Sequence, residues 1–131
     1  MKYIPPFDRL KALVTIHTTR GELAVTCRYD RFVEMIRRYL IGIDFNEAWY
    51  LERNPDIADA IKRGLVASAR EHFINNGYFE GRLPFPMQVD EAWYLKQNAG
   101  VADYVRRGLL ESGQQHFDEN GHREGRLPFG L

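Results

Sequence analysis

The chain has 131 residues, with eighteen basic and eighteen acidic side chains and therefore no formal net charge. This balance does not favour a dedicated nucleic-acid binder, whose surface is usually basic. No apolar run approaches the roughly 18 residues that a membrane span needs, and the single cysteine, Cys27, excludes an intrachain disulfide. Residues 1–15 lack the apolar segment of a signal peptide, so we expect a soluble, cytoplasmic protein of bacterial type.

The first third of the chain predicts an extended arm followed by a β-hairpin. Two consecutive prolines oppose a helix in residues 1–9. Residues 10–18 and 23–29 are rich in β-branched side chains, which favours two strands. A turn at residues 19–22 joins these strands into an antiparallel pair.

An amphipathic helix is predicted after the hairpin, over residues 31–41. Asp30 is placed to cap this helix, and Gly42 is placed to end it. The apolar side chains recur at helical spacing: Phe32, Val33, Ile36, Tyr39 and Leu40. We expect the basic side chains between them to be solvated: Arg31, Arg37 and Arg38.

The rest of the chain contains one stretch twice, as residues 46–85 and 90–129, with 22 identical positions in 40. Glycines that follow basic pairs indicate helix ends, and Ser-x-x-Glu or Ser-x-x-Gln indicates a capping box. These signals predict three short helices in each copy, over 45–53, 56–63 and 68–76, then 90–97, 100–107 and 112–120. The third helix of each copy is expected to end at Asn76-Gly77 or Asn120-Gly121.

The predicted fold is α+β and mostly α. It comprises an N-terminal arm, hairpin and helix over residues 1–43, a first helical repeat over 44–86, and a second over 87–131. Pro84-Phe85-Pro86 forms a stiff, non-helical connector between the repeats.

Three pairs of repeated side chains are candidates for ligand binding. His72 and His116 could form an acid–base or ligand pair, although we favour histidines that pack and hydrogen-bond inside each repeat. Trp49 and Trp93, with the tyrosines that follow them, Tyr50 and Tyr94, could form an aromatic recognition platform, although such residues are more often core.

The third pair is Arg82 and Arg126, each within a repeated Glu-Gly-Arg tail. An arginine of this kind could grip a carboxylate or phosphate with its planar fork. We favour instead an internal ion pair from Arg82 to Asp59 and from Arg126 to Asp103, because both aspartates are repeated. The glycine of the tail then permits a positive φ.

The chain carries none of the common catalytic or metal-binding motifs. It has no glycine-rich phosphate loop, no His-Glu-x-x-His pattern and no serine-centred elbow. Cys27 is interpreted as a small hydrophobe. We therefore expect no catalytic residue, no metal and no cofactor, and a protein that is not an enzyme.

The repeated pattern resembles a known short helical repeat. The residues that carry this resemblance are Tyr50-Leu51, Asn54-Pro55-Asp56-Ile57-Ala58, His72-Phe73, Gly77, Glu80-Gly81-Arg82 and Pro84. Similar repeats are associated with bacterial polysaccharide-related glycosyltransferases and surface proteins, where they accompany catalytic domains. The resemblance covers both repeats and implies an accessory unit, and the second repeat departs from it at Ala99-Gly100.

The leading functional hypothesis is a non-enzymatic protein-interaction or adaptor protein. A small-ligand or glycan-binding module is the alternative, and a small DNA-binding regulator is the least favoured. Because an isolated hairpin is marginal in water, we expect a homodimer through the hairpin. The alternative is that a different protein supplies the missing strand. The expected interface is apolar: Val14, Ile16, Val25 and Tyr29.

Overall fold

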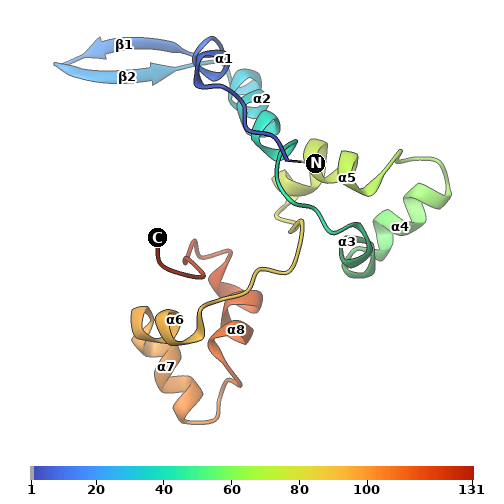
Figure 1. Cartoon of the computed structure of the whole chain (residues 1–131), viewed down its shortest axis with the longest axis vertical. Helices are drawn as coiled ribbons and strands as arrows, with labels where there is room; N and C mark the ends of the chain where they lie inside the picture. Colours follow the sequence, from blue (N-terminus) through green and yellow to red (C-terminus); the bar gives the residue numbers. More distant parts are fainter. Residues whose placement is uncertain (1) are drawn as a thin grey trace. The chain divides into compact units, whose positions relative to one another are not determined.

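The computed structural model describes residues 2–131 (Figure 1). The chain divides into two compact units, Met1–Phe85 and Pro86–Leu131. The predicted start of the second repeat, residue 87, lies one residue after the start of the second unit. The N-terminal arm, hairpin and helix belong to the same unit as the first repeat. The predicted α+β, mostly α class is confirmed.

The N-terminal region begins with a short helix that the sequence did not predict. Helix α1 covers Phe7–Lys11, where we expected the end of the arm and the start of a strand. Pro6 is the residue before the first helical turn, a position that its fixed φ suits. Leu10 is buried, so tertiary packing outweighs the local preference for an extended chain.

The β-hairpin is confirmed, with shorter strands than predicted. Strand β1 covers Thr15–Thr19 and β2 covers Glu22–Thr26, and they pair antiparallel. Arg20 and Gly21 form the two-residue loop with φ values of 53° and 79°. Positive φ at both loop residues is the type I′ geometry that matches the twist of paired strands.

Helix α2 covers Tyr29–Leu40 and starts two residues before the predicted helix. The expectation that Asp30 caps it was wrong, because Asp30 lies in the first turn and Arg28 precedes the helix. The Asp30 carboxylate instead accepts a hydrogen bond from the Arg28 guanidinium at 3.0 Å. The negative charge therefore still lies at the positive end of the helix dipole.

The first repeat forms helices α3 (Glu47–Arg53), α4 (Pro55–Lys62) and α5 (Ala69–His72). The chain then continues without a break as a π-helix, η1 (Phe73–Gly77), and a 3₁₀ turn, η2 (Tyr78–Glu80). One buried cluster joins these elements to α2, and its members are Leu40, Tyr50, Ile57, Ala69 and Phe73.

The second unit repeats the three α-helices and the π-helix, each 44 residues further along, and has a turn at residues 122–125 where the first repeat has η2. They are α6 (Glu91–Gln97), α7 (Ala99–Arg106), α8 (Gly113–His116) and the π-helix η3 (Phe117–Gly121). The core is smaller and consists of Tyr94, Val101 and Phe117. Side chains of Ser68 and Ser112 accept hydrogen bonds from the backbone three residues on, as the capping boxes predict.

The third helix of each repeat reaches its predicted last residue, Gly77 in η1 and Gly121 in η3, but neither glycine turns the chain. Gly77 keeps a right-handed φ of −58°, and the chain turns only at Gly81, whose φ is 84°. An added Cβ at Gly77 would meet the Tyr50 hydroxyl, and one at Gly121 would meet the Tyr94 hydroxyl. These glycines therefore permit a close approach of a tyrosine, and the positive φ belongs to the glycine of the Glu-Gly-Arg tail.

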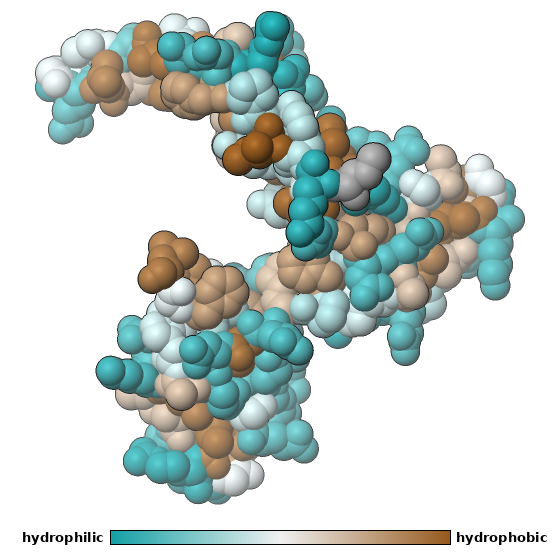
Figure 2. Space-filling model, in the orientation of Figure 1, coloured by the Kyte–Doolittle hydropathy of each residue, from teal (hydrophilic) through white to brown (hydrophobic). Residues whose placement is uncertain are grey.

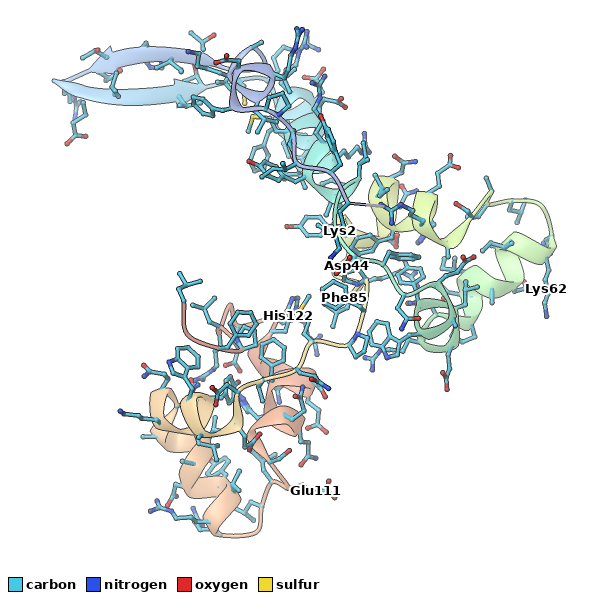
Figure 3. The ribbon with its side chains drawn as sticks, in the orientation of Figure 1. Lys2, Asp44, Lys62, Phe85, Glu111 and His122 are labelled. Carbon is cyan, nitrogen blue, oxygen red and sulfur yellow. The ribbon has the colours of Figure 1, made fainter. Side chains whose placement is uncertain are left out.

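Arg37 of α2 contacts the first repeat, and the N-terminal arm contacts the segment that follows α2. Arg37 donates a hydrogen bond to the Asn75 carbonyl at 3.1 Å and lies 5.5 Å from the centre of the Phe79 ring. Arg37 is thus a packing residue, and the expectation that it is solvated was wrong. In the arm, the Tyr3 amide bonds the Gly42 carbonyl, and Lys2 Nζ lies 4.0 Å from Asp44 (Figure 3).

Candidate functional site

Each unit contains a buried tyrosine bonded to a histidine. The Tyr50 hydroxyl lies 2.9 Å from Nδ1 of His72, and the Tyr94 hydroxyl lies 2.8 Å from Nδ1 of His116. Both tyrosine side chains are fully buried. Burial raises the pKa of Tyr50 to about 12 and also raises the pKa of Tyr94. The phenols therefore stay protonated at neutral pH and are poor general bases.

In the first unit His72 also contacts a row of charged side chains. His72 Nε2 lies 3.6 Å from Glu80, and Glu80 lies 3.5 Å from Arg82. Arg82 then donates to both oxygens of Asp56, at 3.1 and 2.9 Å. This bidentate pair is the geometry in which an arginine binds a carboxylate most strongly. The structure thus brings His72 and Arg82 into one network, through Glu80.

The predicted ion pair between Arg82 and Asp59 was wrong. Asp59 bonds Arg63, one helical turn further along α4, at 3.6 Å. Asp56 lies in the first turn of the same helix and takes the place that we assigned to Asp59. The hydrogen bond from Arg82 holds the pKa of Asp56 below its usual value.

The second unit differs at this position, because Gly100 replaces Asp56. Arg126 donates to the Asn98 side chain and, through Nε, to Glu124 at 2.6 Å. The hydrogen bond from Arg126 also lowers the pKa of Glu124. The predicted partner of Arg126, Asp103, instead bonds the two arginines at the end of α7, Arg106 and Arg107.

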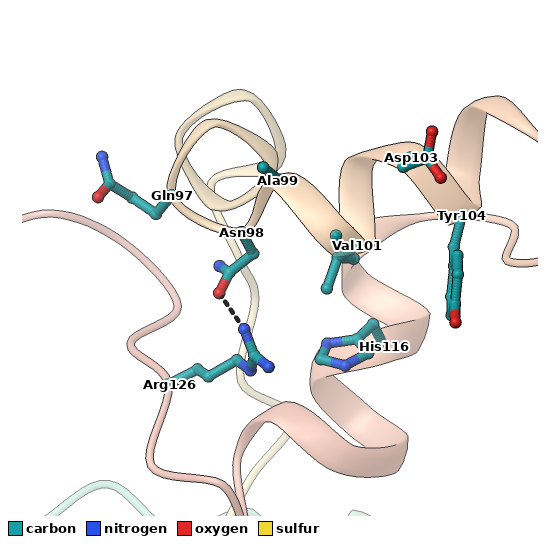
Figure 4. A pocket seen from close by; sticks show the side chains of 9 residues that line it. Gln97, Asn98, Ala99, Val101, Asp103, Tyr104, His116 and Arg126 are labelled. Atoms are coloured by element: carbon teal, nitrogen blue, oxygen red, sulfur yellow. Dashed lines mark hydrogen bonds between the residues drawn. The ribbon is translucent and has the colours of Figure 1, made fainter.

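A pocket of about 450 Å³ opens beside Arg126 (Figure 4). Its walls come from the end of α6, the first two turns of α7, α8 and the Glu-Gly-Arg tail. Asn98, His116 and Arg126 supply its polar groups, whereas Val101 and Tyr104 supply apolar surface. Of the six side chains proposed from the sequence, two therefore line one pocket, His116 and Arg126.

Both tryptophans are half-buried, and Trp93 packs against the core of the second unit, in line with the core role that we favoured. Trp49 lies under the guanidinium of Arg53, whose centre is 5.1 Å from the ring, and Trp93 packs against the backbone of Gly130. The tyrosine that follows each tryptophan is the fully buried residue. The core role that we favoured for the two Trp-Tyr pairs is therefore filled most completely by Tyr50 and Tyr94.

The hairpin carries an exposed apolar face. Ile16 and Val25 are cross-strand partners and Leu23 lies on the same face, with exposed fractions of 46, 60 and 81 %. Hydrophobic side chains are visible at the hairpin surface in Figure 2. Two other residues of the predicted interface lie outside the strands. Val14 precedes β1 and is half-buried, and Tyr29 begins α2.

The two faces of the hairpin differ in exposure. Only His17 and Ala24, which share the opposite face, are partly shielded in the two strands. The face formed by Ile16, Leu23 and Val25 remains open.

Within residues 2–131, no group of three or more His, Cys, Asp or Glu side chains is arranged to hold a metal ion. None of the helices in this described part of the chain has the length and apolar character of a bilayer-crossing helix. Comparison with protein-family models, with characterised proteins and with solved structures found no match to this chain.

Proposed function

We propose that the protein is a non-enzymatic interaction protein that forms a two-fold homodimer through its hairpin. The observation that carries this proposal is the exposed apolar face of a two-stranded sheet. A hairpin of two five-residue strands is marginal in water unless further strands or a helix complete it. A second copy of the chain supplies both the missing strands and the same apolar side chains.

The hydrogen-bonding groups of β1 point alternately toward β2 and away from it. In a two-residue hairpin the pair next to the loop, Thr19 and Glu22, is hydrogen-bonded. It follows that Ile16 and Thr18 direct their backbone N–H and C=O groups toward the free edge of β1. Leu23 and Val25 do the same on the edge of β2.

The edge of β1 is the better pairing surface. Its sequence, Thr-Ile-His-Thr-Thr, contains strand-forming residues and no carboxylate, lysine or arginine, whereas β2 begins with Glu22. Charged residues and prolines are the usual means by which edge strands avoid pairing. Two β1 strands can pair antiparallel about a two-fold axis at His17, so that Ile16 of each copy bonds Thr18 of the other.

The resulting four-stranded sheet has one continuous apolar face, made of Ile16, Leu23 and Val25 from both copies. The absence of net charge also means that two copies do not repel each other strongly. A dimer of this kind is compatible with an adaptor role. That role, the bacterial cytoplasmic setting and the resemblance to accessory repeats stay predictions. The raised pKa of both buried tyrosines supports a structural role for the Tyr–His pairs.

The test is the mass in solution, with a matched pair of proline variants. By sedimentation equilibrium at micromolar concentration, we expect twice the 15.3 kDa of one chain. Thr18→Pro removes an outward N–H from β1 and should give a monomer, because proline cannot donate to the new ladder. Leu23→Pro makes the same change in the cross-strand partner of Thr18, on the free edge of β2. This variant should remain a dimer. A wild-type chain that sediments as a monomer contradicts the proposal.

A further inference from the structure

The two units differ in what the repeated arginine of the tail binds. In the first unit both terminal nitrogens of Arg82 are occupied by the Asp56 carboxylate, and the side chain is 23 % exposed. In the second unit, Gly100 has no side chain to offer. Within residues 2–131, Nη2 of Arg126 has no hydrogen-bond partner, and the side chain is 39 % exposed.

The space left by the missing carboxylate is part of the pocket beside Arg126. Gly100, Asn98 and Arg126 line it together. In the first unit the residue equivalent to Gly100, Asp56, reaches the equivalent arginine, Arg82. An added Cβ at Gly100 meets no atom within 4 Å. The first unit therefore serves as an internal template for a group that could bind here.

We propose that this pocket binds a carboxylate group of a ligand, in the place that Asp56 occupies in the first unit. The carboxylate would accept hydrogen bonds from the terminal nitrogens of Arg126, in the planar geometry that this pair favours. Val101 and Tyr104 would contact an apolar or aromatic body attached to it. His116, from α8, also lines the pocket and adds a polar nitrogen.

The charges around Arg126 favour a carboxylate over a phosphate. Glu124 already bonds Arg126, and Asp103 lines the pocket. A second negative charge on the ligand would be repelled by these carboxylates. A single charge spread over two coplanar oxygens reproduces the Asp56 contact.

Titration of the ¹⁵N-labelled full-length chain, followed by NMR, tests the proposal. The probes are sodium benzoate, as a free small acid, and the acetylated, amidated dipeptide Pro-Asp, as an acidic peptide side chain. We expect saturable chemical-shift changes at the Gly100 amide and the Arg126 Nε–H with one or both of these probes. The probe that binds more tightly identifies the source of the carboxylate. Benzamide, which has the same shape without the charge, should give none. Shifts as large with benzamide as with benzoate, or none with either acid, would overturn the proposal.

Two variants at Gly100 separate the pocket from a general surface effect. Gly100→Asp supplies the carboxylate of the first unit and should weaken benzoate and dipeptide binding at least about tenfold. Gly100→Ala adds only a Cβ in open space and should bind as the wild type does. The Tyr94 and Phe117 resonances report that each variant is folded. A folded Gly100→Asp chain that binds benzoate and the dipeptide as tightly as the wild type does would contradict the proposal.

Discussion

The hydroxyl of Tyr50 occupies the space that any side chain at residue 77 would need. Gly77→Ala should therefore lower the free energy of unfolding of the first unit by about 1–3 kcal/mol, the usual cost of an overpacked core. Tyr50→Phe removes the hydroxyl, so the double variant should lose less than the sum of the two single variants. Urea unfolding, followed by NMR signals of the first unit, measures these differences.

The equivalent pair in the second unit is the control for this cycle. Gly121→Ala and Tyr94→Phe should show the same non-additivity, because a Cβ at Gly121 meets the Tyr94 hydroxyl in the same way. Strictly additive losses of stability in both units would show that the tyrosine hydroxyl is not the reason that residues 77 and 121 are glycines.

The pair between Asp56 and Arg82 predicts a pH dependence of stability in the first unit. The folded pKa of Asp56 lies below its ordinary 3.8, so the stabilisation is present above that value and is lost as the pH falls through the folded pKa. The Asp56 side chain is 60 % exposed, which limits the contribution to less than about 1 kcal/mol. In Arg82→Gln, an NMR titration should find the Asp56 pKa higher than in the wild type. An unchanged titration curve would rule out the ion pair.

Several residue roles could be predicted from the sequence because their signals are local. The capping serines, Ser68 and Ser112, and the helix-ending glycines, Gly64 and Gly108, act within a few residues of chain. The partner of Arg82 could not be predicted in this way. The repeat pointed to the shared Asp59, but helix phase and reach select Asp56, which the second repeat lacks.

At the scale of elements, the hairpin turn has one unfavourable residue. Arg20 has a φ of 53°, a left-handed conformation that costs a non-glycine side chain energy. Asn-Gly is the preferred type I′ sequence, so Arg20→Asn should stabilise the hairpin by about 0.5–1 kcal/mol. Amide hydrogen exchange in β1 and β2 at one fixed protein concentration measures the change. Unchanged or faster exchange in Arg20→Asn would count against this turn geometry.

The elements that the sequence predicted well are those with strong periodic or capping patterns. Helices α3, α4, α6 and α7 lie close to the expected positions, and both strands were found, although β1 starts at Thr15 and not at residue 10. Helix α1 and the π-helices were missed because they depend on distant packing. Leu10 is buried in the first case, and Gly77 contacts the Tyr50 hydroxyl in the second.

At the scale of the whole molecule, the second unit has its own core, and a hydrogen bond joins its two ends. The Asp90 amide bonds the Pro128 carbonyl at 2.9 Å, which ties the tail to the start of α6. We therefore expect a fragment of residues 86–131 to fold alone, with a helical circular dichroism spectrum and a cooperative thermal transition. Phe117→Ala should unfold it, because loss of a fully buried phenylalanine costs about 3–5 kcal/mol. An unfolded wild-type fragment would show that this unit depends on the first.

The homodimer through β1 has one geometric consequence that a crosslink can detect. With the two-fold axis at His17, the two His17 residues form a non-hydrogen-bonded pair, whose Cα atoms lie about 4.5 Å apart. That separation suits a disulfide, whereas the two Thr18 residues would lie beyond the roughly 7 Å limit.

The most direct measurement is therefore disulfide formation between copies, in a Cys27→Ser background that removes the native thiol. His17→Cys should oxidise rapidly to a covalent dimer of twice the chain mass, and Thr18→Cys should remain largely monomeric under the same mild oxidation. Equal crosslinking of the two variants, or none in either, would contradict pairing of β1 strands about His17.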